Sequence, residues 1–418
     1  MEASEKKEHI RKKRALKYLF FTVFLDMLGV GILIPVIPEL FANPASQYYL
    51  LSAQKSVNTG YLLLGLLTAV YPIAIFFAAP VLGQLSDKYG RKPVLALCLF
   101  GTGIGYVLFA IGILVRSIPL LFFARIFDGI TGGNISVAQA AIADVTEPQD
   151  RAKNFGLIGL AFGLGFILGP ALGGVLSNQH IVYWFSAQFP FFVAAGFAFL
   201  NTGLILKYFK ETNIKLTQAK INLLESFQKI RSAKKYKPVR TLFIVAFFLS
   251  AGFAFFTSFF NVFLTHKFGF TQSRIGSFFA FIGLCTALTQ GFVTRFIAHR
   301  FKDVQILSVT YFATALSVVL YLIPSKQIFL YFIVPLFAVS YGLTASNASA
   351  IVSRLAPSDA QGEVLGINAA LVSLAQAFPP LLAGFLAALF SPGTPILFAS
   401  ALVIVAGIIF VASRKKHQ

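Results

Sequence analysis

The stretch TGYLLLGLLTAVYPIAIFFAAPVLGQLSDKYGRKP, residues 59–93, contains two patterns that together indicate the class of this protein. Residues 59–82 carry no charge, and about 20 apolar residues, at roughly 1.5 Å each in a helix, cross the hydrocarbon core of a bilayer. Pro72 lies inside this run; it would break a soluble helix, whereas membrane spans tolerate proline. The stretch therefore predicts a membrane-spanning helix that ends in the basic loop 83–93.

The composition extends this prediction to the whole chain. Of the 418 residues, 57% are hydrophobic and 12% are charged, whereas about a quarter of an ordinary soluble chain is charged. So little polar surface cannot cover a soluble core, and we expect an all-α membrane protein that lies in the lipid bilayer. The net charge of +20 would suggest a nucleic-acid partner in a soluble protein. Here the basic residues lie in loops between apolar runs, which excludes nucleic acid.

Twelve apolar runs follow one another along the chain, at about 18–40, 59–82, 93–114, 119–143, 154–177, 183–206, 240–265, 273–298, 304–323, 327–353, 364–390 and 395–413. With twelve spans, 29 of the 35 Lys and Arg residues fall on one side of the membrane and five on the other. A count of eleven or thirteen would destroy this asymmetry. The positive-inside rule then predicts a multi-pass protein of the cell inner membrane with both termini in the cytoplasm.

The spans divide into two halves around one long loop. A constant shift along the chain places Gly156 on Gly366, Pro170 on Pro380 and Gly174 on Gly384, as in transporters built from a duplicated unit. We expect five segments: a basic cytoplasmic tail at 1–17, an N-terminal six-helix bundle at 18–206, a cytoplasmic linker at 207–239, a C-terminal six-helix bundle at 240–413 and a cytoplasmic tail at 414–418.

The linker has apolar residues at roughly helical spacing among lysines and arginines: Leu216, Leu223, Leu224, Phe227 and Ile230. One interpretation is a basic amphipathic helix on the anionic inner leaflet. The other is a solvated linker with some helix.

The loop GQLSDKYGRKP, residues 83–93, resembles the signature of the loop between spans 2 and 3 in the major facilitator superfamily. The resemblance implies the major facilitator fold, twelve transmembrane helices in two six-helix halves. It also implies a conformational latch between the halves in one state, formed by Gly83, Asp87, Gly90, Arg91 and Asp144. Glycines permit a tight turn, and an aspartate can accept charge-assisted hydrogen bonds from an arginine. The alternative is a plain basic loop with turn glycines.

Residues 163–174, GLGFILGPALGG, are similar to the span-5 motif of the antiporter branches of that superfamily. Small residues four apart allow close helix packing, and a proline adds a bend. The resemblance therefore implies a hinge, and the residues alone imply at least a packing interface, at Gly165, Gly169, Pro170, Gly173 and Gly174.

The strings LDMLGVGILIPVIP (25–38), RIFDGITGG (125–133) and AIADVT (141–146) resemble twelve-span drug/proton antiporters, most closely the tetracycline exporters. The chain departs from those exporters at Thr286 and Thr314, where they carry a histidine and an aspartate, and at Asp128, where they have a small residue. The predicted C-terminal spans hold no acid. These departures argue against tetracycline itself as the substrate and assign proton coupling to the N-terminal half.

Three ionisable residues lie well inside the predicted spans: Asp26, Arg125 and Asp128. A charge at mid-membrane costs at least about 2.5 kcal/mol, so each is a candidate for proton coupling. Asp26 has no partner in its own helix; it either binds and releases protons or is capped by water or backbone. Arg125 and Asp128 are three residues apart and can pair. They form either a self-neutralising pair or a switch that protonation opens, and Arg125 matches the family's proton-coupling arginine.

Uncharged polar residues at mid-span are candidates for the substrate cavity: Asn134, Gln139, Asn261, Gln290, Asn347 and Asn368. We find no P-loop, metal cluster or Ser-His-Asp order, so we expect no enzyme activity, no ATP drive, no metal and no cofactor. The prediction is a monomeric secondary transporter that exports a small, largely apolar organic compound or drug in exchange for protons, by alternating access. The alternatives are proton-coupled uptake or exchange of a nutrient or metabolite, and a non-transporting membrane sensor.

Overall fold

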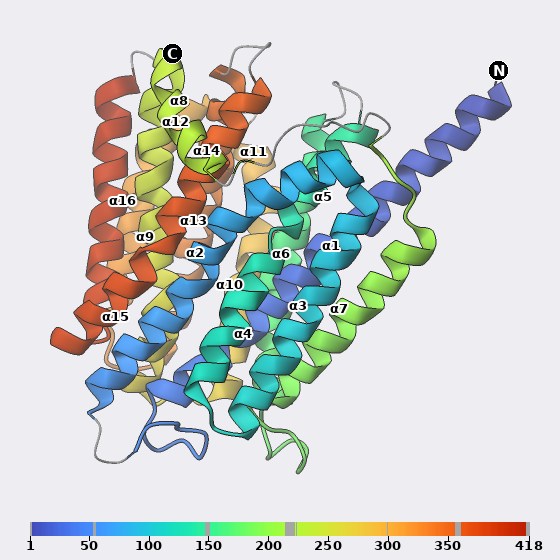
Figure 1. The fold of residues 1–418 in the computed structure, drawn as a ribbon. Coiled ribbons are helices and arrows are strands. Elements are labelled where there is room, and N and C mark those ends of the chain that lie inside the picture. The colour runs from blue at the N-terminus through green and yellow to red at the C-terminus, as the bar shows by residue number, and fades with distance from the viewer. Residues whose placement is uncertain are drawn as a thin grey trace. The chain divides into compact units, whose positions relative to one another are not determined.

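The computed structural model describes residues 2–52, 56–146, 151–213, 222, 224–298, 300–355 and 361–414. This part of the chain is helical and contains no β-strand (Figure 1). Its elements are α1 (Glu2–Phe41), α2 (Val57–Tyr89), α3 (Arg91–Leu114), α4 (Ile118–Thr131), α5 (Asn134–Val145), α6 (Arg151–Leu176), α7 (Phe189–Tyr208), α8 (Glu225–Ser232), a 3₁₀ turn (Ala233–Lys235), α9 (Lys237–Phe268), α10 (Gln272–Leu288), a π-helical turn (Thr289–Val293), α11 (Thr294–Ala298), α12 (Asp303–Leu320), α13 (Ile328–Leu355), α14 (Gln361–Ala377), α15 (Pro379–Leu389) and α16 (Thr394–Ser413).

Ten stretches of helix in the described residues are long and apolar enough to cross a membrane. Two of the twelve runs expected from the sequence are not among them. The run 119–143 is divided into α4 and α5 at Gly132 and Gly133, and the run 154–177 holds the shorter apolar helix Gly163–Leu176. The total of twelve spans therefore stays a prediction.

The segment expected to be a loop at 83–93 is mostly helical. Residues up to Tyr89 continue α2, and α3 begins at Arg91, so that Gly90 alone connects the two helices. Gly90 has φ 100° and ψ 155°, a conformation that only glycine adopts without strain. The helix direction therefore changes within one residue, which holds the signature residues of both helix ends close together.

The chain divides into two compact units. Unit 1 comprises Met1–Val36 and Phe77–Leu223, and unit 2 comprises Ile37–Phe76 and Leu224–Gln418. The boundary passes through α2, so the first part of this helix groups with the C-terminal helices, whereas the sequence placed the whole of 18–206 in one bundle. Gly65 of α2 shows why: a Cβ there would lie 2.8 Å from the Cα of Gly384, because the two backbones meet at glycines.

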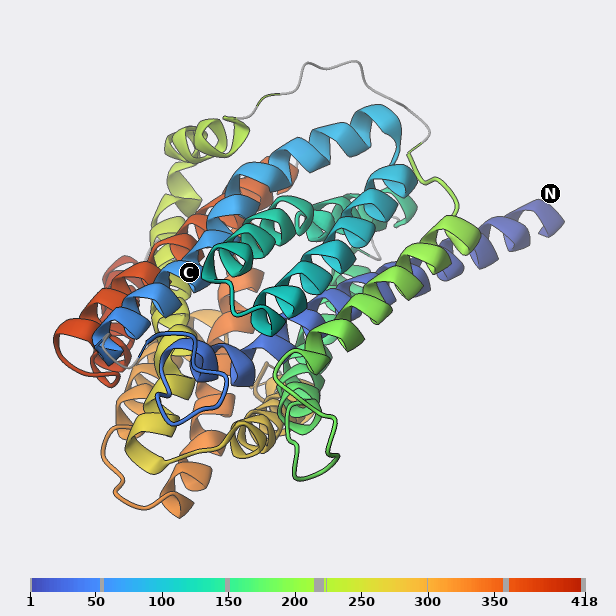
Figure 2. The ribbon, with the colours of Figure 1, turned by 60° about the horizontal axis from the view of Figure 1, so that its bottom comes forward.

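Each unit has its own apolar core. In unit 1, α3 packs against α4, α5 and α7, and α1 contributes Leu19 and Val23 to the same cluster. In unit 2, α9 and α12 both pack against α16 and α13 (Figure 2). The buried rings of Phe243, Tyr311 and Phe410 belong to this core. Both cores are built from helices alone.

Of the predicted linker, residues 207–213, 222 and 224–239 are described, and they include α8 and the 3₁₀ turn. Residues 214–221 and 223, which include Leu216 and Leu223, lie outside the described residues. In α8, Phe227 stacks edge-on against Phe76 with ring centroids 5.2 Å apart, and Ser226 donates a hydrogen bond to the Phe76 carbonyl. Contact with lipid headgroups remains a prediction for this segment.

Candidate functional site

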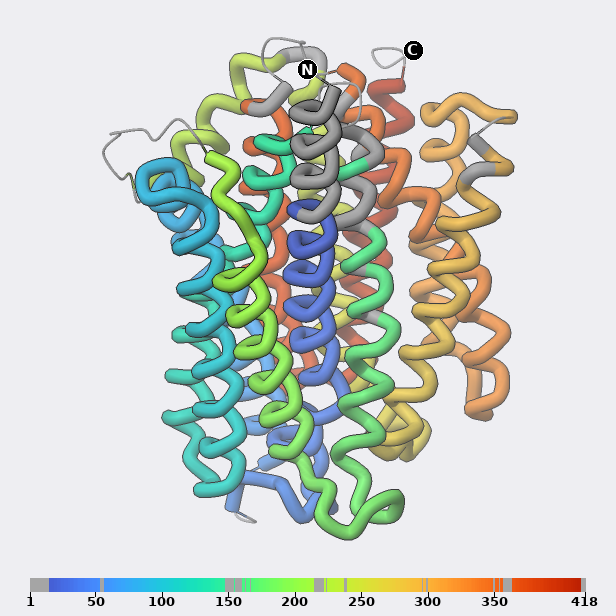
Figure 3. The backbone as a smooth tube through the Cα atoms, turned by 90° about the vertical axis from the view of Figure 1, so that its right-hand side faces the viewer, coloured from blue at the N-terminus to red at the C-terminus, as the bar shows by residue number. Residues whose placement is uncertain are grey.

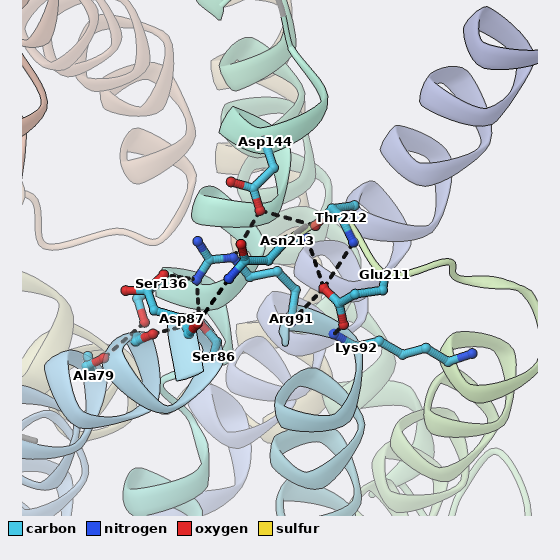
Figure 4. A network of polar contacts seen from close by, with 11 residues as sticks. Ala79, Ser86, Asp87, Arg91, Lys92, Ser136, Asp144, Glu211, Thr212 and Asn213 are labelled. Carbon is cyan, nitrogen blue, oxygen red and sulfur yellow. Dashed lines mark hydrogen bonds and ion pairs between the residues drawn. The ribbon is translucent and has the colours of Figure 1, made fainter. Parts of the chain in front are cut away.

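Arg91, the first residue of α3, joins three helices of unit 1 (Figure 4). Its buried guanidinium donates to the hydroxyl of Ser86 at 2.5 Å and forms an ion pair with Asp87 at 2.6 Å, both on α2. Its Nε donates to Oδ2 of Asp144 on α5 at 3.0 Å. Asp87, Arg91 and Asp144, which the sequence assigned to one latch, are therefore in one polar network.

Glu211, which the sequence analysis did not single out, completes this network. Its carboxylate accepts hydrogen bonds from the backbone N–H groups of Arg91, at 2.8 Å, and Lys92, at 3.0 Å. These first-turn N–H groups have no partner within α3, and a negative charge is favourable at a helix N-terminus. A Cβ at Gly90 would collide with this carboxylate. Glycine is required at position 90 both by its backbone angle and by the space that Glu211 occupies.

The two residues after Glu211 bind the same network. Thr212 donates from its hydroxyl to Oδ2 of Asp144 at 3.2 Å, and Asn213 donates from its amide to the backbone carbonyl of Asp87 at 3.1 Å. Glu211 is the single acidic residue in the sequence between Asp150 and Glu225. That isolation among basic and apolar residues is the one sequence signal that pointed to it. At Gly83, by contrast, a Cβ would meet no described atom within 4 Å.

A second group of polar residues is buried deeper in unit 1. Asp26 of α1 is 4% exposed, and its Oδ1 accepts a hydrogen bond from Nδ2 of Asn134 at 3.0 Å. Asn134 is the first residue of α5, directly after the break at Gly132 and Gly133. The partner of Asp26 thus comes from the interrupted fourth run of the chain, 119–143 (span 4). Asn134, expected in the substrate cavity, is fully buried against a carboxylate.

Arg125 and Asp128 of α4 form a buried ion pair, with Nη1 and Oδ2 2.9 Å apart. The pair packs tightly against α3, because a Cβ at Gly105 would lie 2.9 Å from the Cβ of Asp128. Asp128 is also within electrostatic range of Asp26. Two carboxylates are therefore buried near one another in unit 1, one paired with a cation and the other with an amide.

The glycines of α6 bring its backbone into contact with α1 (Figure 3). A Cβ at Gly165 would lie 2.5 Å from the Cβ of Met27, and one at Gly169 would lie 2.6 Å from the Leu28 carbonyl oxygen. Further along, a Cβ at Gly173 would lie 2.5 Å from the Ile32 carbonyl oxygen. Pro170 lies inside α6 and Gly174 is buried. This close contact begins one residue after Asp26.

The remaining cavity candidates have varied surroundings. Gln290 donates to the carbonyl of Gly342 at 3.3 Å and accepts from Ser346 at 2.9 Å, which ties the π-helical turn to α13. Asn347 donates to the Leu343 carbonyl of its own helix at 2.7 Å. Three others differ in exposure: Gln139 is exposed, Asn261 is buried and Asn368 is half-buried. Their assignment to a substrate cavity stays a prediction.

Two further observations concern ionisable groups. Glu39, near the end of α1, is 6% exposed and accepts a hydrogen bond from Asn43 at 2.9 Å; the sequence analysis did not single it out. Within the described ranges, no cluster of three His, Cys, Asp or Glu side chains has a geometry that would hold a metal ion.

Comparison with known proteins identifies the family. The family model of the Major Facilitator Superfamily matches residues 19–378. The tetracycline resistance protein of class C from Escherichia coli is 32% identical over 376 residues, which cover 89% of each chain. Multidrug resistance protein 1 of Bacillus subtilis (strain 168) is 27% identical over 379 residues, 90% of each chain.

Solved structures show the same fold. The human organic anion transporter MFSD10 (TETRAN) superposes with a TM-score of 0.72 at 23% identity, covering 96% of this chain and 99% of that one. A D-xylose-proton symporter superposes with a TM-score of 0.75 at 14% identity, covering 95% and 96%. With its apolar helices and these relatives, the chain belongs to the Major Facilitator Superfamily and is a multi-pass membrane transporter of small molecules, not an enzyme.

Proposed function

We propose that this transporter exports a small, largely apolar organic compound in exchange for protons. It does so as a monomer of the cell inner membrane, by alternating access between two six-helix halves with both termini in the cytoplasm. The observation that carries the proposal is the buried carboxylate of Asp26, hydrogen-bonded to the break in span 4 and adjacent to the α1–α6 glycine contact. The tetracycline and multidrug resistance proteins among its relatives support an exporter.

The two buried carboxylates have different means of neutralisation. Asp128 has the guanidinium of Arg125 at 2.9 Å. Asp26 is bonded to a neutral amide. A buried carboxylate without a cation is stable mainly in its protonated form, because burial penalises the charge and an amide compensates for little of it. We therefore assign the transported proton to Asp26 and the charge-sensing role to the Arg125–Asp128 pair.

Uncharged polar side chains in the C-terminal helices are consistent with a substrate that carries no charge. Thr314 and Thr344 are within hydrogen-bond distance of each other at 3.2 Å, and Thr286 donates to the Ile282 carbonyl at 2.8 Å. Tetracycline exporters carry a histidine and an aspartate at the positions of Thr286 and Thr314. This chain therefore has hydroxyls there, which form hydrogen bonds within unit 2. This chemistry favours an apolar compound and leaves the coupling to unit 1.

The direction of proton movement tests the proposal. Purified protein in liposomes would be loaded with a compound found by its thermal stabilisation of the protein, then diluted into compound-free medium, while a pH-sensitive dye reports the lumen. Antiport predicts that the lumen becomes more acidic as the compound leaves, because protons enter in exchange. The Asp26→Asn variant should give no acidification. An alkaline lumen would instead show symport, and an unchanged lumen would show transport without protons.

The twelve-span topology gives a separate prediction. After replacement of Cys98 and Cys285, single cysteines would be introduced at the exposed positions Ser52, Ser325 and Lys234. The first two should react with a membrane-impermeant thiol reagent on intact cells. The third should react only after permeabilisation, because the positive-inside rule places its basic segment in the cytoplasm. The reverse pattern at any two positions would contradict the proposed topology.

A further inference from the structure

In the contact between Asp26 and Asn134, two side-chain oxygen atoms accept no hydrogen bond from any described residue. Asp26 is 4% exposed and Asn134 is fully buried, and one hydrogen bond of 3.0 Å joins Oδ1 of Asp26 to Nδ2 of Asn134. Within the part of the chain that the structure describes, neither Oδ2 of Asp26 nor Oδ1 of Asn134 has a hydrogen-bond partner. Both atoms are buried acceptors, and a buried acceptor without a donor is unfavourable.

One added proton supplies the donor that this contact lacks. An ionised carboxylate only accepts hydrogen bonds, and an amide oxygen also only accepts. When a proton from bulk water binds Oδ2 of Asp26, that oxygen becomes a donor, and the amide oxygen of Asn134 becomes its acceptor. The acid and the amide then share two parallel hydrogen bonds, and both oxygens are satisfied. When the proton leaves, the two oxygens repel each other and one bond remains.

The groups around the contact do not supply this donor. Asp128 on α4 and the thiol of Cys98 on α3 both interact electrostatically with Asp26, but neither gives Oδ2 of Asp26 a hydrogen-bond partner. Arg125, the buried cation of α4, is ion-paired with Asp128. The hydrogen bonds of the Asp26 carboxylate therefore depend on its own proton and on Asn134.

The position of Asn134 gives this proton-dependent contact a mechanical consequence. Asn134 begins α5 directly after Gly132 and Gly133, the point at which span 4 is interrupted. Two glycines at a helix break are a site where backbone angles change easily. Asp26 lies on α1 one residue before its close contact with Gly165 of α6. The contact between Asp26 and Asn134 therefore connects the α1–α6 helix pair to the break in span 4, and its strength depends on the proton.

We propose that Asn134 is the positioning residue of the proton site, which closes a two-bond acid–amide pair when Asp26 is protonated and loosens when the proton leaves. The inference rests on the proposed function, since it takes Asp26 as the proton carrier. It adds a specific partner and a specific place in the fold, the α4–α5 break, where the proton changes the structure.

Infrared difference spectroscopy between acidic and alkaline pH tests the pair in the purified full-length protein in lipid nanodiscs. The band of a protonated carboxyl group that disappears in Asp26→Asn belongs to Asp26. In the wild type this band should lie at the low frequency of a carbonyl that accepts a hydrogen bond. In Asn134→Ala it should remain but shift to the higher frequency of a carbonyl without that bond, and proton-driven accumulation should fall about tenfold or more.

A matched control is available in the same unit. Asn201 of α7 is also fully buried and makes no hydrogen bond to a carboxylate among the described residues. Asn201→Ala should leave the Asp26 band where it is, so a shift confined to Asn134→Ala cannot come from a general loosening of the fold.

Different outcomes overturn different claims. An Asp26 band at the frequency of a free acid in the wild type overturns the acid–amide pair without any need for the variant to fold. An unshifted band in Asn134→Ala does the same, and in both cases Asp26 remains the proton carrier. If no band in the wild type depends on Asp26 at any pH, the proton site itself is wrong, and the inference is overturned together with the mechanism on which it rests.

Discussion

Asp26→Asn is expected to abolish proton-driven accumulation of substrate while preserving substrate binding. Asparagine has nearly the shape of a protonated aspartate and is permanently neutral, so it fixes the site in one charge state. Binding should then no longer vary with pH, because the carboxylate whose charge changes during the cycle is gone. The measurements are accumulation under an imposed pH gradient in liposomes and substrate affinity at several pH values.

Asp128→Asn is the matched comparison, because it neutralises the other buried carboxylate of unit 1. Loss of the Asp128 charge removes the ion-pair partner of Arg125 at 2.9 Å, and breaking a buried pair costs about 3–5 kcal/mol. A lower yield of folded protein is expected, with some pH dependence of binding retained. If Asp26→Asn keeps the wild-type pH dependence and Asp128→Asn loses it, the proton belongs to Asp128. If both keep it, proton antiport is not the mechanism.

The parts of the site that were predictable from the sequence are local. Arg125 and Asp128 are three residues apart in one helix, so helical geometry brings them together. Asp87 and Arg91 are four apart on either side of the turn at Gly90, and the signature string indicated that they belong to one latch. The helix break in span 4, at Gly132 and Gly133, was not predicted. The apolar run 119–143 indicated one continuous span, because a short break does not change the apolar content.

The contacts that complete the site are not local. Asn134 is 108 residues from Asp26, and Glu211 is 120 residues from Arg91. No spacing rule joins such residues, because their approach depends on how helices pack. Asn134 was expected in the substrate cavity for the same reason: a polar residue at mid-span faces a cavity or another helix, and only the packing distinguishes these environments.

Gly90→Ala is expected to destabilise unit 1 and to reduce transport strongly. Gly90 has φ 100° and ψ 155°, a region that costs a residue with a side chain about 1–3 kcal/mol. Its new methyl group would also displace the carboxylate of Glu211 from the first turn of α3, and the loss of such a cap costs about 1 kcal/mol. The apparent melting temperature in detergent and transport in liposomes measure the two effects.

Two further variants separate these causes. Gly83→Ala lies in the same signature but in the helical part of α2, where a Cβ meets no described atom; it should not lower the melting temperature, since alanine favours helix by about 1 kcal/mol over glycine. In the double variant Gly90→Ala/Glu211→Ala the collision is absent, so its cost should be less than the sum of the two single costs. Additive costs would show that Glu211 and Gly90 act independently. The Glu211 carboxylate would then cap α3 independently of the turn at Gly90. In that case glycine would not be needed at position 90 to make room for this carboxylate.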